Sequence, residues 1–187
     1  MDLSGPYSGN IDALYNTFYT IPSTGGQLVT CNFALHYIAT NKKAIQNFVK
    51  LLDKILAPGG IFIFTAFNGP KIFKLLSEGD WNESSGDFTY SIKKKYAGNF
   101  TGESQNIDVM LPFSDNEYYT ESLINTETLN AELEKKKIKL IATGGFETYF
   151  DKFAKDKPYF SQQLTDTDRK FISLYQYCVY HKNNKRL

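Results

Sequence analysis

Several features that assign a protein to a class are scarce in this sequence. It has only two cysteines among 187 residues, Cys31 and Cys178. They lack the spacing of metal-ligand pairs and both lie in apolar, strand-like runs, so we expect reduced thiols in a reducing compartment. Long hydrophobic runs are also lacking, because the run "IFIF" from Ile61 is far too short to cross a bilayer.

Charge of one sign is not in excess either. Lysine and arginine together number 21 against 20 acidic residues, which gives a net charge of +1. No global field therefore favours nucleic acid or a membrane, and any nucleic-acid contact must come from a local patch. The chain is rich in aromatic side chains, with 15 Phe and 13 Tyr, which suit stacking surfaces as well as core packing. Its apolar fraction of 42% and its length are ordinary for one globular domain.

Residues 27–67 have the pattern of a strand, a helix and a second strand. The segment "QLVTCNFALHY" (27–37) is rich in β-branched and apolar residues, which predicts a buried strand. A helical period follows, with Thr40 or Asn41 as the N-cap, and "PGG" (58–60) ends it before the strand "IFIFTAF" (61–67). One apolar stripe of that helix contains Ile45, Phe48, Val49, Leu52, Ile55 and Leu56. This order predicts a βαβ unit with parallel strands.

The rest of the chain adds further elements to this unit. We expect a helical turn at 70–76, antiparallel strands in an insertion at about 77–118, and a helix at 122–137 whose Leu129 and Leu133 face the core. A strand at 138–146, a loop with a short helical segment at 155–170 and a last strand at 171–182 follow. A short amphipathic piece is expected at 11–19. The predicted fold class is α/β, with a parallel core and an antiparallel strand pair at the end.

Two of the predicted strands end in residues that a core strand does not need. His36 and Tyr37 end the first strand, and Phe67 and Asn68 follow the second. Ligands of open α/β sheets bind beyond the carboxyl ends of the strands, so we expect these four side chains to line one crevice. A lone histidine is more often a core residue bonded to a backbone carbonyl, so this residue type alone does not establish a site.

The same residues carry a resemblance to a known family. "CNFALHY", then a helix, then "LAPGGIFIFTAFNG" resemble the mRNA cap guanine-N7 methyltransferases, which are class I enzymes that use S-adenosylmethionine. "LPFSDNEYYTESLINTETL" resembles their cap-binding segment, and "FISLYQYCVYHK" resembles their closing strand. The resemblance runs from about Asp2 to Lys182 and is closest to capping enzymes of large cytoplasmic DNA viruses. It implies a Rossmann-like methyltransferase fold with an antiparallel insertion.

One part of the family pattern has no counterpart in the sequence. These enzymes begin with a strand and a Gly-rich turn, followed by a strand that ends in an acidic residue, and both features hold the cofactor. Here "MDLSG" resembles the loop after the family's third strand. The resemblance therefore implies that residues 1–187 form a single domain, the C-terminal portion of a methyltransferase domain, which alone should bind the cofactor poorly.

The resemblance also assigns roles to residues. It implies cap-guanine contacts from His36, Tyr37, Phe67, Glu121 and Tyr175, and cofactor contacts from Asp2, Asn32 and Phe33. Guanine N7 has a free lone pair, so the reaction needs neither a side-chain acid or base nor a metal, but only positioning and tolerance of positive charge on the ring. Structural roles stay open: Glu121 as a solvated helix start, Tyr175 as a core tyrosine, and Lys93–Lys95 as a solvated face rather than a path for the cap triphosphate.

The activity that the resemblance implies is methyl transfer from S-adenosylmethionine to N7 of the 5′ guanosine cap of mRNA. Two alternatives remain: a non-catalytic module that binds the cap or a partner, and a class I methyltransferase with another substrate. The expected partners are the capped 5′ end of mRNA and upstream capping-enzyme domains or a stimulatory subunit, with no membrane. The expected location is the cytoplasm, in a viral factory or virion, or the nucleus for a cellular protein.

Overall fold

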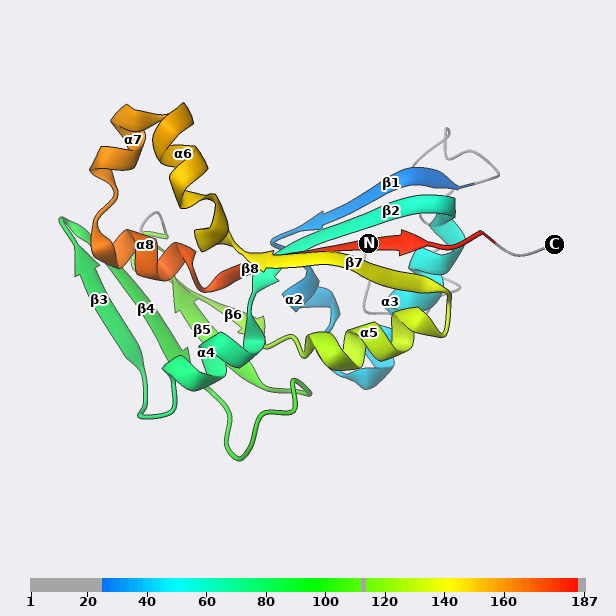
Figure 1. Cartoon of the computed structure of the whole chain (residues 1–187). Helices are drawn as coiled ribbons and strands as arrows, with labels where there is room; N and C mark the ends of the chain where they lie inside the picture. Colours follow the sequence, from blue (N-terminus) through cyan, green and yellow to red (C-terminus); the bar gives the residue numbers. More distant parts are fainter. Residues whose placement is uncertain (1–24, 112–113, 185–187) are drawn as a thin grey trace.

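Two four-stranded sheets form the framework of the molecule (Figure 1). The computed structural model describes residues 25–111 and 114–184. In spatial order, the first sheet contains β1 (Gly26–Asn32), β2 (Leu56–Phe67), β8 (Tyr175–Lys182) and β7 (Ile138–Gly145). The second sheet contains β3 (Trp81–Ser85), β4 (Phe88–Lys94), β5 (Asn106–Met110) and β6 (Tyr118–Ser122). The predicted amphipathic piece at 11–19 and Asp2 lie outside the described residues.

The predicted βαβ unit is confirmed. Helix α3 (Lys42–Ile55) crosses from β1 to β2, and the two strands pair in parallel, with Val29 opposite Phe62. Asn41 is the N-cap, because its side chain accepts a hydrogen bond from the backbone N–H of Ala44. The predicted end of the helix at "PGG" (58–60) is wrong. The helix ends earlier, at Ile55, and residues 58–60 already belong to β2. The parallel part of the sheet is this one pair, since β8 runs antiparallel to both β2 and β7.

The first strand is shorter than predicted. It ends at Asn32, and Phe33 has a φ of +49°, a conformation that an L residue adopts in turns and not in strands. The N–H of Phe33 donates to the carbonyl oxygen of Thr65 at 2.9 Å, which fixes the turn to β2. The next residues form the short helix α2 (Leu35–Ile38). The prediction that His36 and Tyr37 end a strand is therefore wrong, since both lie on a helix just beyond it.

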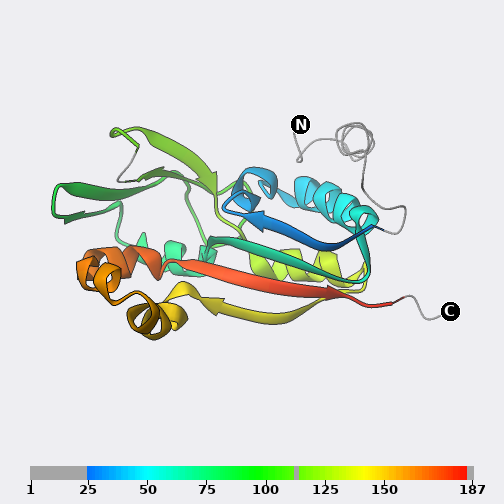
Figure 2. The same ribbon diagram turned by 90° about the horizontal axis from the view of Figure 1, so that it is seen from above.

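The antiparallel insertion is confirmed and continues to Ser122. Helix α4 (Gly69–Leu75) leads into it from β2, and its four strands pair only antiparallel. Alternate residues such as Ile92, Ile107 and Val109 are fully buried against a second core cluster. The sheet therefore packs by one face, and its strands stand at one end of the first sheet (Figure 2).

The segment before β8 is more helical than predicted. A 3₁₀ helix, η1 (Phe146–Tyr149), follows β7, and the chain continues through α6 (Phe150–Asp156), α7 (Pro158–Gln163) and α8 (Asp166–Ile172). A capping box starts α8, in which Thr165 and Asp168 bond to each other's backbone N–H. The prediction of a loop with one short helical segment at 155–170 is therefore wrong, because three helices occupy most of this range.

Helices cover one face of the first sheet. Helix α5 (Thr126–Glu134) packs there beside α3, and Leu129 and Leu133 are fully buried, as predicted. In Figure 1 the helices α2, α3 and α5 lie on one side of the sheet, while α6 and α7 rise on the other. The α/β class is confirmed. In the described part of the chain, no helix has the length and apolar character needed to span a membrane.

Candidate functional site

A cavity of about 580 Å³ lies where the two sheets meet. This volume is within the range of small-molecule sites. Side chains from six segments line it: Phe33, His36, Tyr37, Tyr90, Leu111, Glu121, Phe146, Phe171, Ile172 and Tyr175. We call it the aromatic cavity.

Five residues that the sequence singled out line the aromatic cavity together. Phe33 and the helix α2, with His36 and Tyr37, bring in the motif that follows β1. Glu121 comes from the last strand of the insertion and Tyr175 from the first position of β8. Glu121 therefore lies in a strand and not at a helix start. Segments far apart in the sequence thus converge on one cavity.

Two predicted site residues, Phe67 and Asn32, do not line the cavity. Phe67 is only 5% exposed and does not line the cavity, but its ring stacks on that of Tyr175 at 4.2 Å between centroids. Asn32 is exposed at the end of β1, where its Oδ1 accepts a hydrogen bond of 3.4 Å from the hydroxyl of Thr65. Asp2 belongs to the residues that the structure does not describe. Lys93 lies over the ring of Tyr118 and does not line the cavity either.

A buried acid and a buried imidazole meet inside the cavity. Nδ1 of His36 lies 3.3 Å from Oε2 of Glu121, and the two residues are 6% and 8% exposed. The pair is in electrostatic contact without hydrogen-bond alignment, and neither ring nitrogen has a hydrogen-bond partner among the described residues. Burial lowers the pKa of His36 to about 4 and raises the pKa of Glu121 to about 7. At neutral pH the imidazole is therefore uncharged and the carboxyl is close to its midpoint of ionisation.

Aromatic rings form the walls around this acid. The ring of Phe33 meets that of Tyr175 edge-on at 5.3 Å, and Phe67 supports Tyr175 from behind. Burial and the nearby Glu121 carboxyl both raise the pKa of Tyr175, so its hydroxyl stays protonated. Tyr37 is 53% exposed, and its ring lies 4.1 Å from that of His36. The cavity thus offers flat apolar walls, an acid within and an accessible phenol.

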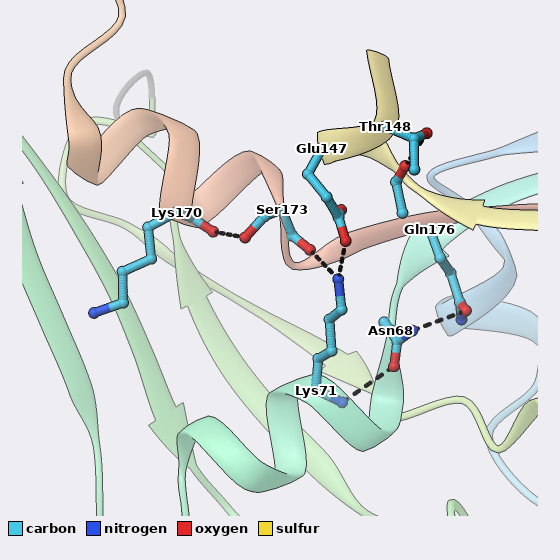
Figure 3. A network of polar contacts seen from close by, with 8 residues as sticks. Asn68, Lys71, Glu147, Thr148, Lys170, Ser173 and Gln176 are labelled. Carbon is cyan, nitrogen blue, oxygen red and sulfur yellow. Dashed lines mark hydrogen bonds and ion pairs between the residues drawn. The ribbon is translucent and has the colours of Figure 1, made fainter. Parts of the chain in front are cut away.

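A polar network holds the elements that contribute to the cavity (Figure 3). Nζ of Lys71 on α4 lies 2.5 Å from Oε1 of Glu147 and donates to the carbonyl oxygen of Ser173 at 3.0 Å. Beside it, the amide of Asn68 donates to Oε1 of Gln176 at 3.2 Å. These contacts join α4 to η1, to the turn after α8 and to β8. They fix the backbone next to Phe146, Ile172 and Tyr175.

Sequence reasoning missed half of the cavity lining. The missed residues are Tyr90, Leu111, Phe146, Phe171 and Ile172. Their positions depend on contacts between distant segments: the hydroxyl of Tyr90 donates to Asp168 at 2.8 Å, and its ring stacks on Phe171 at 4.4 Å. The alternation in "FTYSIKKK" predicts that Tyr90 shares a face with Ile92, but no local pattern reveals what that face meets.

Comparison with known proteins relates the chain to methyltransferases. It matches the mRNA (guanine-N(7))-methyltransferase domain family over residues 10–180. The mRNA-capping enzymes of two African swine fever virus isolates, from Pretoriuskop and Namibia, are each 27% identical to it over 190 aligned residues. The alignments cover 97% of this chain and 22% of each relative, so the chain spans about a fifth of their length.

Two solved structures with similar folds are methyltransferases. An S-adenosylmethionine-dependent methyltransferase from Clostridium acetobutylicum has a TM-score of 0.54 at 13% identity, over 98% of this chain and 63% of that one. The methyltransferase CcbJ from Streptomyces caelestis has a TM-score of 0.50 at 13% identity, over 87% of this chain and 63% of that one. Identities this low indicate the fold, which is that of class I methyltransferases. From the match over residues 10–180, the chain belongs to the mRNA (guanine-N(7))-methyltransferase domain family.

Proposed function

We propose that this chain takes part in methylation of the 5′ cap of mRNA at guanine N7, with S-adenosylmethionine as the methyl donor, and that the aromatic cavity binds the cap guanine. The observation that carries the proposal is the convergence of His36, Tyr37, Glu121 and Tyr175 on one cavity of purine-compatible size. These are the residues to which the resemblance gives cap-guanine roles, apart from Phe67, which acts through Tyr175.

The side chains suit a reaction that needs positioning more than proton transfer. Guanine N7 attacks with its own lone pair, so no base removes a proton, and the ring gains positive charge as the methyl group arrives. An uncharged His36 does not oppose that charge, whereas an imidazolium would. Burial keeps the pKa of His36 at about 4, so the imidazole stays neutral at physiological pH. The aromatic walls hold the flat base by stacking.

Glu121 is the proposed guanine reader. Guanine presents N1–H and N2–H donors on one edge, and a carboxylate accepts from both, whereas adenine has no N1–H donor to offer. A charge-assisted contact of this kind in a buried site contributes roughly 1.5–3 kcal/mol. The same negative charge favours the cationic product ring. Both effects require the ionised form of Glu121, whose pKa of about 7 is within physiological range.

The cofactor would approach from the end of β1. Phe33 lines the aromatic cavity and Asn32 is exposed beside it, at the carboxyl end of a parallel strand where such sheets bind ligands. These two residues fit a role as one border of the cofactor site. S-adenosylmethionine supplies the activated methyl group when bound. A contact from Asp2 to the adenine remains part of the proposal.

We further propose that the chain is the C-terminal portion of a methyltransferase domain that works beside other capping domains or a stimulatory subunit. The matched African swine fever virus enzymes are much longer than this chain, which leaves room in those proteins for such domains. Since these relatives are viral, the proposed location is the cytoplasmic factory of a virus. The proposed substrate is the capped 5′ end of mRNA.

A non-catalytic cap-binding module is the second candidate. It is favoured by the residues proposed to contact the guanine, because His36, Tyr37, Glu121 and Tyr175 all come from this chain. Cap binding by the chain alone therefore requires no cofactor. Methylation does require S-adenosylmethionine, so the two candidates differ in whether this chain also binds it.

Titration of the chain with the cap analogue GpppG and, separately, with S-adenosylmethionine tests both candidates. We expect GpppG to bind, and Glu121→Gln to weaken its binding at least about tenfold, or about 1.4 kcal/mol. The control is Glu117→Gln, an exposed acid near the start of the same strand. Binding of both ligands supports the enzyme and binding of the cap alone supports the module. Equal GpppG affinities for wild type and Glu121→Gln would remove the guanine site.

A further inference from the structure

Two hydrogen bonds between side chains join the start of α8 to the hairpin of β3 and β4, which lies beside it (Figure 1). The hydroxyl oxygens of Ser85 and Thr165 lie 2.7 Å apart, and the hydroxyl of Tyr90 donates to Oδ1 of Asp168 at 2.8 Å. Of these four residues, Tyr90 alone lines the aromatic cavity. The two bonds therefore connect the same elements, but only one of them reaches the candidate site.

The carboxylate of Asp168 serves two neighbours with separate oxygens. Oδ2 accepts hydrogen bonds from the backbone N–H and the hydroxyl of Thr165, at 2.8 and 2.9 Å, and completes the capping box of α8. Oδ1 accepts from Tyr90, a residue 78 positions earlier in the chain. The start of a helix needs only the bonds to Thr165, so capping does not account for the contact with Tyr90.

Both partners of this contact have the protonation states that it needs. Burial and the hydrogen bond to Asp168 raise the pKa of Tyr90 to about 12, so its hydroxyl keeps its proton at neutral pH. Burial alone would raise the pKa of Asp168, but the hydrogen bonds from Thr165 and Tyr90 outweigh it and lower the pKa, so the carboxyl is ionised. A hydrogen bond to an ionised acceptor is roughly twice as strong as one between neutral groups. The end of the Tyr90 side chain is therefore firmly held.

The ring of Tyr90 is also supported from behind. It stacks on the ring of Phe171 with 4.4 Å between centroids and 28° between planes. Phe171 is 6% exposed and meets the ring of Tyr175 edge-on at 5.6 Å. Stacked rings tolerate a range of offsets, so the hydrogen bond to Asp168 is the contact that fixes where the Tyr90 ring ends.

We propose that Tyr90 contacts the guanine in the aromatic cavity, and that Asp168 is a positioning residue that holds the Tyr90 ring for this contact. The inference rests on the proposed function, and it adds two residues to which the resemblance gives no role. A flat base is held by stacking only where the aromatic walls stand at contact distance, and a ring that is fixed before binding loses less conformational entropy when the base arrives. Asp168 does not line the cavity and acts through the Tyr90 hydroxyl.

The test measures the affinity of the full chain for GpppG by titration calorimetry, and its thermal unfolding in the same buffer. Tyr90→Phe keeps the ring and its stacking on Phe171 but loses the hydroxyl, so we expect GpppG to bind about fivefold more weakly. Tyr90→Leu removes the ring as well and should weaken binding at least about tenfold.

The matched control is Ser85→Ala, which removes the other hydrogen bond between the same two elements. It should lower the melting temperature about as much as Tyr90→Phe and leave the GpppG affinity unchanged, because neither Ser85 nor Thr165 lines the cavity. If the Tyr90 hydroxyl only stabilised the fold, Tyr90→Phe would behave like this control.

A double-mutant cycle tests the role of Asp168. Asp168→Ala should weaken GpppG binding about as much as Tyr90→Phe does, and the double variant should bind no more weakly than either single one, because both changes remove the same contact. Asp168→Ala also loses the capping box, so every affinity is measured well below the lowest melting temperature of the set. Tyr90→Phe keeps the capping box and tests the contact with the start of α8 intact.

Equal GpppG affinities for Tyr90→Phe and Ser85→Ala overturn the inference. Losses of affinity in Asp168→Ala and Tyr90→Phe that add in full overturn the positioning role, because Asp168 would then act separately from the Tyr90 hydroxyl. The proposed function fails at a different point: a wild-type chain that does not bind GpppG removes the guanine site, and this inference with it. Where wild type binds GpppG and the Tyr90 variants bind equally well, this inference alone is overturned.

Discussion

At the scale of single residues, Glu121 is placed where it weakens the fold. Its carboxyl is 8% exposed and faces an uncharged imidazole and aromatic rings, so burial raises its pKa from 4.5 to about 7. A group whose folded pKa is raised supplies its stability below its unfolded pKa and loses it as the pH rises through its folded pKa. Above pH 7 the ionised acid is therefore a destabilising feature, which fits a role in ligand recognition.

The first prediction concerns stability. Glu121→Gln removes the ionisation, so the variant should be more stable than wild type at pH 8, by about 1–3 kcal/mol in the free energy of unfolding. At pH 5 the folded wild type keeps its proton and the difference should nearly vanish. Urea denaturation at both pH values measures it. The lowered pKa of His36 makes the folded state less stable as the pH falls towards 4, so both measurements are made above that pH. A variant with the same advantage at pH 5 and pH 8 would contradict the assigned pKa of Glu121.

The second prediction concerns cap affinity and pH. Only ionised Glu121 accepts hydrogen bonds from guanine N1–H and N2–H, so affinity for GpppG should rise from pH 6 to pH 8. With a pKa of about 7 the ionised fraction increases about tenfold over this range, and the affinity should follow. Titration calorimetry at pH 6, 7 and 8 measures the change. Glu121→Gln should give a flat profile, and a profile of wild-type steepness in that variant would assign the titration to another group.

At the scale of elements, prediction from sequence succeeded where local periodicity matches burial. The stripe on α3 and the leucines of α5 repeat with the helical period, so both helices were predictable. The end of β1 could not be predicted in this way. Phe33 has a positive φ that turns the chain, and this conformation is held by hydrogen bonds to Thr65, which is distant in the sequence. Helices α6 and α7 carry no buried stripe, so nothing in their pattern distinguishes them from a loop.

The third prediction tests how η1 is held. Lys71→Met removes the contacts to Glu147 and to the carbonyl of Ser173, which position η1 and therefore Phe146 at the cavity wall. Both side chains are about 40% exposed, so the ion pair contributes only roughly 0–1 kcal/mol to stability. GpppG affinity should fall about threefold with a small change in melting temperature. Lys152→Met, which loses an exposed contact to Asp156 on α6, is the control. Equal affinities for Lys71→Met and Lys152→Met would show that η1 needs no such anchor.

At the scale of the whole molecule, the candidate site lies where the two sheets and the helical segment before β8 meet. The first sheet supplies Tyr175, and the turn and helix α2 after β1 supply Phe33, His36 and Tyr37. The insertion supplies Tyr90 and Glu121, and the helical segment before β8 closes the remaining wall. Resemblance to a family predicted the residues with motif character, but Phe67 proved to support Tyr175 from behind. The rest of the lining depends on how the two sheets meet, and a single sequence holds no local pattern for that contact.

The most direct test of this account compares three dinucleotide cap analogues, GpppG, IpppI and ApppA, by titration calorimetry at pH 8. Inosine lacks the N2 amino group, and adenosine lacks both that group and the N1–H donor, so the series removes first one and then both of the donors that Glu121 is proposed to read. Wild type should bind GpppG at least about tenfold more tightly than ApppA, with IpppI between them, and Glu121→Gln should lose most of this preference. A preference for guanine that is unchanged in Glu121→Gln would contradict the assignment of the aromatic cavity as the guanine site.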